Sequence, residues 1–222
     1  MGMKADCANC RTHACYTKGV NCTGVDEADI LAAYSEEERR IMKTAAYVEG
    51  TFYSNITRLE ETAEFAKAMG YHRLGLAFCI GLNAEARYIA RFYTKQGFEC
   101  YSVCCKNCSF AKKELGLKQV KPELEHEAMC NPKFQAKFLA DKGVELFISC
   151  GLCVGHDALF NAACPGPVTT LVVKDRLLAH NPSAPSTRAT GSASSASWMK
   201  MKSKRQQKVQ RWTFSQETAR IG

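Results

Sequence analysis

The segment Val144–Phe160, VELFISCGLCVGHDALF, decides the fold. It begins with an apolar run, Val144 to Ile148, and we expect a buried strand at 144–149, directly before Cys150. A glycine and a second thiol, Cys153, follow at once, and we expect a helix to begin at Asp157. A buried strand that ends in a thiol-bearing loop before a helix is typical of the repeating units of a parallel α/β sheet.

The same pattern recurs on both sides of this segment. Asn83 and Asn131 are the expected N-caps of two helices, the second with Pro132 in its first turn. Alternation with short connections predicts an α/β fold: a parallel, Rossmann-like sheet of about four strands with flanking helices. Continuous apolar strands fit a sheet that is covered on both faces. The additional elements expected are helices at 83–96 and 132–141 and strands at 72–82, 98–105 and 168–173.

Residues 26–69 predict a helical lead-in to this sheet. Asp26 or Asp29 is expected to cap a first helix, and Ser35, followed by three glutamates, a second. A further helix has apolar residues at helical spacing and ends at Gly70. We interpret these helices as scaffold.

Length, hydropathy and charge limit the class of protein. A chain of 222 residues can bury one sizeable core, and no run approaches the ~18 apolar residues of a membrane helix. The N-terminus, MGMKADCANC, has no apolar signal core, so we expect a cytoplasmic protein with no membrane partner. Residues 183–222 hold eight Lys or Arg and one acidic residue, which is +7 of the net charge of +8. The near-neutral remainder makes nucleic-acid binding unexpected outside this tail.

Thirteen cysteines, an odd number without a secretion signal, favour metal binding or redox chemistry over a disulfide framework. Residues 1–25 are expected to form a small metal knuckle, because four thiolates suit zinc or an iron–sulfur cluster and turn formers lie between them. His13 is a substitute ligand. The alternative is a set of free thiols in a disordered tail. The expected ligands follow the spacing C-x2-C-x4-C-x6-C and are Cys7, Cys10, Cys15 and Cys22.

A second set of thiols lies at the ends of the expected strands. Open α/β sheets bind ligands beyond the carboxyl ends of their strands. Cys79 follows the first strand, Cys105 the second and Cys153 the third. Cys130 precedes the helix that leads back to the third strand. We expect these four thiols to line one crevice as a second metal site, although buried cysteine is also common in apolar cores.

Other residues near the strand ends have two interpretations each. His156 could act as a base for Cys153 or Cys130, and Asp157 beside it could be only a helix cap. A polar cluster at 174–181 follows the last strand and would either bind an anionic substrate or form a solvated strand exit. Strand alternation points Cys104 away from the crevice. Three other thiols are expected in packing or surface positions: Cys100, Cys108 and Cys164.

The C-terminal residues differ in composition from the rest of the chain. Residues 183–197 are rich in Ser, Ala, Thr and Pro, and 198–211 are basic. They predict a disordered tail whose charge could attract nucleic acid or an anionic surface. The abrupt change also fits a shifted reading frame or a non-native sequence. The expected organisation is a Cys-rich knuckle (1–25), a helical lead-in with the α/β domain (26–182) and a basic tail (183–222).

The order of several motifs resembles one family. The segments TRLEETAEFAKAMGYHRLGLAFCIGLNAEA, CCKNC, EAMCNP, GLCVGHDALF and VVKDRLLAHNP follow a cysteine-rich N-terminus. Together they resemble the bacterial and archaeal domain-of-unknown-function family 1847 over about residues 5–182. Its members are described as metal-binding proteins found largely in anaerobes, so the resemblance implies that the four crevice thiols act together. It names no reaction, and the tail departs from the short apolar and aromatic end of the family.

Three functions follow from these patterns. The first is a metal-binding protein that holds zinc or an iron–sulfur cluster on thiolates. The second is a thiol-redox or metal-dependent enzyme that uses Cys153 or Cys130 as a nucleophile with His156 as base. The third is a binding or regulatory module in which zinc only supports an interaction surface.

Overall fold

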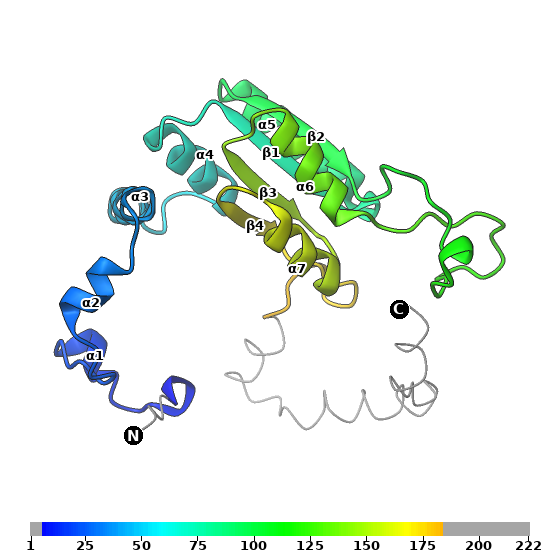
Figure 1. The fold of residues 1–222 in the computed structure, drawn as a ribbon. Helices are drawn as coiled ribbons and strands as arrows, with labels where there is room; N and C mark the ends of the chain where they lie inside the picture. The colour runs from blue at the N-terminus through cyan, green and yellow to red at the C-terminus, as the bar shows by residue number, and fades with distance from the viewer. Residues whose placement is uncertain (1–5, 184–222) are drawn as a thin grey trace. The chain divides into compact units, whose positions relative to one another are not determined.

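A computed structural model describes residues 6–183 of the chain (Figure 1). The chain divides into two compact units, Met1–Tyr71 and His72–Gly222. Apart from its first residue, the predicted basic tail at 183–222 lies outside the described residues. None of the helices in the described part combines the length and the apolar character that a membrane span requires.

The first unit is helical, as the sequence predicts. Asp26 caps α2 by accepting a hydrogen bond of 2.8 Å from a backbone N–H two residues on. Ser35 and Thr57 each form a reciprocal capping box with a glutamate three residues further along. Gly70 ends the last helix in the left-handed region, with φ of 69°. The elements are η1 (Cys7–Asn9), α1 (Ala14–Thr17), α2 (Glu27–Ala32), α3 (Glu36–Phe52) and α4 (Arg58–Ala68).

The second unit contains the α/β sheet. All four strands are parallel, in the order β2-β1-β3-β4, which confirms the predicted fold class. Right-handed crossovers place α5 on one face and α6 and α7 on the other, where Figure 1 shows α6 and α7 side by side. The elements are β1 (Arg73–Phe78), η2 (Ile80–Leu82), α5 (Asn83–Lys95), β2 (Glu99–Cys104), η3 (Lys113–Leu115), α6 (Pro132–Asp141), β3 (Leu146–Cys150), α7 (Val154–Ala163) and β4 (Val168–Val172).

The core of this unit lies on the two central strands. Every residue of β3 is buried, and so are all residues of β1 after the first, as expected of parallel strands covered on both faces. Gly75 in β1 allows a close approach, because a Cβ there would lie 2.8 Å from Cγ1 of Val144. Gln135 of α6 is also fully buried, and its amide donates to the carbonyls of Phe78 and Val103. This helix is thereby fastened to the ends of β1 and β2.

Two helix starts differ from the prediction. Asn83 is not the cap of α5 but its first residue, because η2 runs directly into the helix and puts Leu82 at the cap position. The helix α7 begins at Val154, three residues before the predicted start at Asp157. By contrast, the predicted cap of α6 is confirmed, since the Asn131 side chain accepts from a backbone N–H at 3.1 Å.

Candidate functional site

The candidate site lies where the direction of chain winding reverses. From β1 the chain passes to β2 at one edge of the sheet, and from β2 it crosses to β3 on the other side of β1. Open α/β sheets bind ligands at such a reversal, beyond the carboxyl ends of the two central strands. Cys79 follows β1, and its N–H donates to the carbonyl of Cys150 at the end of β3, at 3.1 Å. The predicted strand ends therefore meet at this edge.

Cys105 is the central thiol of this edge. It is 1% exposed, and its thiol lies close enough to Cys79 and Cys130 to change the pKa of both. Its sulfur also accepts from the N–H of Ile80 at 3.4 Å, and its carbonyl accepts from the N–H of Asn131 at 2.8 Å. Residues from the ends of β1 and β2 and from the start of α6 thus converge on one sulfur atom.

The three thiols share their protons unequally. Hydrogen bonding from Cys105 lowers the pKa of Cys79 and of Cys130, in each case to about 5. The same two contacts raise the pKa of Cys105, which keeps its proton. Because one S–H serves one acceptor at a time, the group is best described as a protonated thiol shared between two thiolates. Thiolates are the form of cysteine that binds metal and acts as a nucleophile.

Cys153 joins this edge through an arginine. Nη2 of Arg176 donates to Sγ of Cys153 at 3.0 Å. The bond to Cys153, and then the charges of Cys79 and Cys130, raise the pKa of Arg176. The guanidinium therefore lies close to three of the four predicted crevice thiols.

The loop that carries Arg176 is held by its own hydrogen bonds. The carboxylate of Asp175 accepts from the N–H groups of Leu177 and Leu178, both at 2.9 Å. The backbone of Asp175 makes two hydrogen bonds with His180: its N–H donates to Nδ1 of the imidazole at 3.1 Å, and its carbonyl accepts from the N–H of His180 at 2.8 Å. The polar cluster after β4 is thus a closed turn that fixes the position of the arginine.

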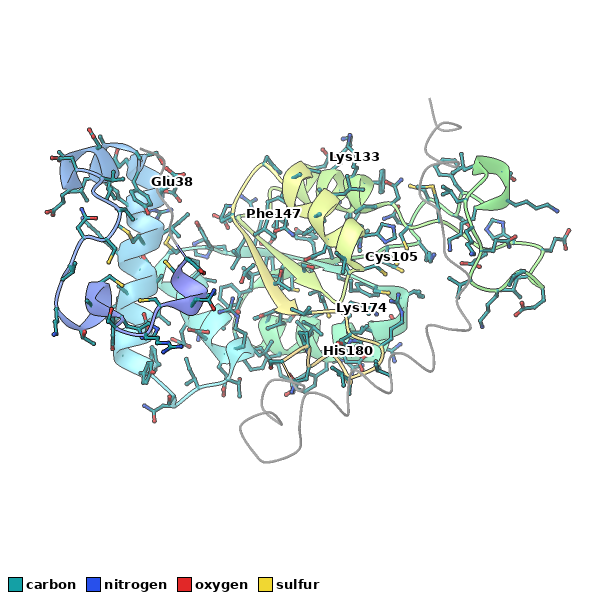
Figure 2. The ribbon with its side chains drawn as sticks, turned by 90° about the horizontal axis from the view of Figure 1, so that it is seen from below. Glu38, Cys105, Lys133, Phe147, Lys174 and His180 are labelled. Atoms are coloured by element: carbon teal, nitrogen blue, oxygen red, sulfur yellow. The ribbon has the colours of Figure 1, made fainter. Side chains whose placement is uncertain are left out.

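Two lysines add positive charge to the same edge. Lys174 lies beside Cys79, since a Cβ on Gly81 would be 3.7 Å from Nζ of this lysine and 3.9 Å from Sγ of Cys79, and Figure 2 labels it at the same end of the sheet as Cys105. Lys106 is hydrogen-bonded to Cys130 and donates to the carbonyl of Ala128. Sequence analysis did not single out Lys106. Its position directly after a strand-end cysteine was the available signal.

Gly151 shapes the turn between the thiols of β3 and α7. Its φ is +63°, and a Cβ at this position would lie 2.7 Å from Cδ2 of Leu82, a side chain that is 1% exposed. Only glycine adopts this conformation without strain in such a confined space. The turn separates the buried Cys150 from the partly exposed Cys153. Burial is the main cause that raises the pKa of Cys150 to about 12.

The histidine and aspartate of α7 have different surroundings. A positive charge on His156 contributes to the lowered pKa of Cys130, which places the imidazole near that thiol. The carboxylate of Asp157 accepts from Oγ of Ser149 at 2.6 Å and so is tied to β3. The structure therefore keeps His156 as a candidate base for Cys130, while Asp157 has a structural partner.

The remaining thiols of the second unit lie outside this group. Sγ of Cys104 accepts from the N–H of Lys106 at 3.4 Å. Sγ of Cys108 donates to Oδ1 of Asn107 at 2.9 Å and accepts from the Asn131 amide at 3.2 Å. Burial raises the pKa of Cys100 to about 11 and that of Cys164 to about 12. These surroundings match the packing roles expected of them.

The N-terminal thiols lie in short turns. Cys10 contacts Oγ1 of Thr12 at 3.8 Å, and Sγ of Cys22 donates to the carbonyl of Val20 at 3.6 Å. Within residues 6–183, no group of three or more His, Cys, Asp or Glu side chains has an arrangement that could hold a metal ion. This statement covers both predicted quartets, so their metal binding stays a prediction.

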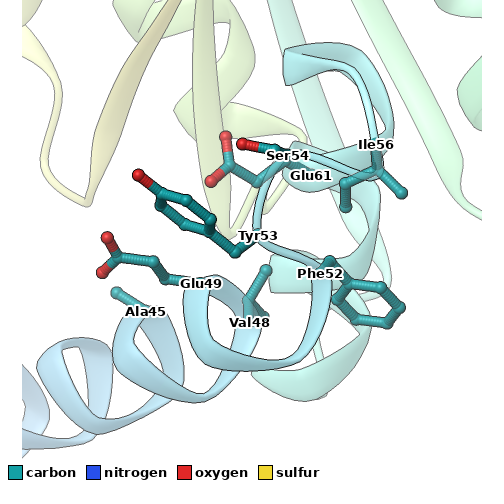
Figure 3. Close-up of a pocket in the computed structure, with 8 residues that line it drawn as sticks. All are labelled: Ala45, Val48, Glu49, Phe52, Tyr53, Ser54, Ile56 and Glu61. Carbon is teal, nitrogen blue, oxygen red and sulfur yellow. The ribbon is translucent and has the colours of Figure 1, made fainter.

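The first unit also contains a pocket of about 370 Å³. Its wall combines the apolar Val48 and Phe52 with the carboxylates of Glu49 and Glu61, which Figure 3 shows on the same side as the ring of Tyr53. No cysteine lines this pocket. It is therefore separate from the thiol chemistry of the chain.

Comparisons with known proteins show the family of the chain. An uncharacterized protein of the archaeon Methanocaldococcus jannaschii is 46% identical over 176 residues, which cover 79% of this chain and 90% of the relative. No solved structure matches the chain. The model of a family described as a protein of unknown function, DUF1847, matches residues 19–171. The chain, cysteine-rich and built on a parallel α/β sheet, therefore belongs to the DUF1847 family.

Proposed function

We propose that the protein binds zinc or an iron–sulfur cluster on the thiolates of Cys79, Cys105, Cys130 and Cys153. The observation that carries this proposal is the convergence of two thiols, Cys79 and Cys130, on the buried sulfur of Cys105, beside a fourth thiol, Cys153, that Arg176 contacts. These cysteines come from four separate segments of the chain. Chance packing of apolar cysteines does not require them to meet at the edge where α/β sheets bind ligands.

The chemistry of these side chains fits a soft metal. Four thiolates are the common ligand set of structural zinc and of iron–sulfur clusters. Two of the four already have a lowered pKa, so they offer the deprotonated form that a metal needs. The N–H of Ile80 that donates to Cys105 is the kind of contact that stabilises metal-bound sulfur. An iron–sulfur cluster would supply electron transfer here, and zinc would supply structural or Lewis-acid chemistry.

Loading this site requires two changes. Cys105 has to lose its proton, and Cys153 has to give up part of its contact with Arg176. Metal binding should therefore release protons and weaken as pH falls towards 5. Because these two changes come with metal binding, the four thiols need not have the geometry of a metal site before the metal binds.

The N-terminal quartet is the second part of this proposal. Cys7, Cys10, Cys15 and Cys22 lie within sixteen residues, so a metal ion could draw them together without a large core. The turns between them support this, since Gly19 has φ of +64° and the Asn21 side chain accepts from two backbone N–H groups.

Metal analysis with a visible spectrum, on protein purified without oxygen, tests the proposal. Broad visible absorbance with iron and acid-labile sulfide supports a cluster, and tightly held zinc in a colourless protein supports zinc. Cys105→Ser should lose the metal of the crevice. The matched control Cys164→Ser, at a half-buried thiol outside the group, should keep it. Absence of zinc and iron from the native protein would overturn the proposal.

A thiol enzyme is the second candidate, because His156 lies near Cys130 and a positive charge on it favours the thiolate. In that case Cys130 or Cys153 should react with iodoacetamide much faster than the other cysteines while any metal is retained. His156→Gln should slow the reaction of Cys130. Uniform alkylation of all accessible thiols would contradict this candidate and leave zinc-supported binding as the remaining role.

A further inference from the structure

Positive charge is concentrated over the crevice beyond what four thiolates at a metal would need. Arg176 contacts Cys153. A Cβ on Gly81 would lie 3.7 Å from Nζ of Lys174 and 3.9 Å from Sγ of Cys79, which places this lysine beside that thiol. Lys106 donates to the carbonyl of Ala128, two residues before Cys130. A zinc ion with four thiolates carries a net charge of about −2, and a cluster held by four thiolates is also an anion. The three cations therefore exceed the negative charge of such a metal site by about one.

The carboxylates near these cations keep their negative charge but bind other groups. In the part of the chain that the structure describes, none of the three cations forms an ion pair with a carboxylate. Asp175 is bonded to the backbone of its own turn, and Asp157 is bonded to Ser149. Glu85, at the start of α5, lies near enough to raise the pKa of Cys150, but it is exposed to solvent.

The cation-bearing turn is also prepared for a ligand. The hydrogen bonds of Asp175 and His180 hold the backbone on both sides of Arg176, and the contact with Cys153 orients its guanidinium, so less conformational freedom is lost when an anion binds. A guanidinium has five N–H donors in a planar fork, and one of its terminal nitrogens is occupied by Cys153. The arginine therefore has further donors for a carboxylate or phosphate group.

We infer that Arg176 and Lys174 form a binding site for a small oxyanion, a carboxylate or phosphate group of a substrate, at the mouth of the thiol crevice. The inference deepens the proposed function and rests on it, since the surplus of charge is counted against a thiolate metal site. The anion binds beside Cys153, so the substrate that carries this group lies within reach of the metal or the reactive thiol. The site selects small anionic molecules as the substrate class.

Calorimetric titration of the full chain with inorganic phosphate and with malonate tests the site, at constant ionic strength kept with chloride. Saturable binding of either probe is expected, and preference for one identifies the source of the oxyanion. Arg176→Gln should weaken binding about tenfold or more, since it removes a charge-assisted contact. Arg91→Gln, on an exposed position of α5, removes the same charge and should change binding less than about twofold.

Metal analysis of the same samples separates the two claims. If the protein holds metal and neither probe binds above the chloride background, the oxyanion site is wrong and the metal proposal stands. If a probe binds and Arg176→Gln weakens it in protein that holds no metal, the oxyanion site stands and the metal proposal fails. Equal binding by wild type and Arg176→Gln, with both variants folded by circular dichroism, would overturn the assignment of this arginine.

Discussion

Nη2 of Arg176 lies 3.0 Å from Sγ of Cys153, and this contact joins the turn after β4 to the loop after β3. The two residues are 23 positions apart, and each follows a strand of the same parallel sheet. The contact brings the last polar cluster of the described chain to the thiols of the central strands. It also gives Cys153 a charged partner that any metal or substrate has to accommodate.

Cys105→Ala should change the ionisation of its neighbours. In metal-free protein the substitution removes the hydrogen bond that holds the pKa of Cys79 and Cys130 at about 5. At least one of these pKa values should rise towards the ordinary ~8.5 of a thiol. Ultraviolet absorbance of the thiolates during a pH titration measures the change. Cys164→Ala is the control, and identical titration curves for both variants would show that Cys105 is not the shared donor.

Gly151→Ala should destabilise the turn that presents the crevice thiols. The new methyl group would require φ of +63° and would lie 2.7 Å from the buried Leu82 side chain. We expect the free energy of unfolding, measured in denaturant, to fall by about 1–3 kcal/mol. Gly155→Ala, with no atom within 4 Å of the new Cβ, should be neutral or more stable by up to ~1 kcal/mol, because alanine favours the helix. Equal stability of the two variants would contradict the confined turn.

The segment between Cys105 and Cys130 should loosen at acid pH. Glu127 pairs with Lys112 at 2.5 Å and accepts from the N–H groups of Val120 and Lys121. These contacts, the lysine first, lower the pKa of Glu127 to about 2. A carboxyl group with a lowered pKa stabilises the folded form fully above its unfolded pKa of ~4.3 and loses this effect as pH falls towards 2.

Hydrogen exchange can measure this effect at the two backbone amides that Glu127 accepts from. Glu127→Gln should increase their exchange by about tenfold or more near neutral pH. Glu125→Gln, at an exposed position of the same segment, is the matched control. Two outcomes would contradict this role of the carboxylate. One is that both amides are as protected from exchange in Glu127→Gln as in the wild type, and the other is that their protection in the wild type does not fall between pH ~4 and 2.

Cys10→Ser should affect the N-terminal quartet and leave the crevice intact. The thiols of residues 7–22 are local in sequence, so loss of one should release the metal of that quartet alone. Metal analysis, together with protection of Cys153 from alkylation, separates the two sites. Cys153→Ser is the reciprocal variant. Equal loss of metal from both sites in Cys10→Ser would show that the two quartets form one centre.

Local chemistry made much of the fold predictable. The short apolar run before Cys150, bounded by glycines, favours a buried strand, and the cap at Asn131 follows from a side chain that bonds the backbone of its own helix. The start of α7 was predicted wrongly. Asp157 is a good cap in isolation, but Ser149 holds its carboxylate, and the tight turn at Gly151 begins the helix earlier.

The sequence by itself determined the parallel sheet and the placing of thiols at its strand ends, because both depend on hydrophobic period and on the order of segments. Only the tertiary structure decided that Cys105 is the shared thiol and that Lys106 and Arg176 join it. Contacts between distant side chains depend on the path of each loop, and that path follows from packing at positions such as Gly151. No sequence pattern encodes such a path.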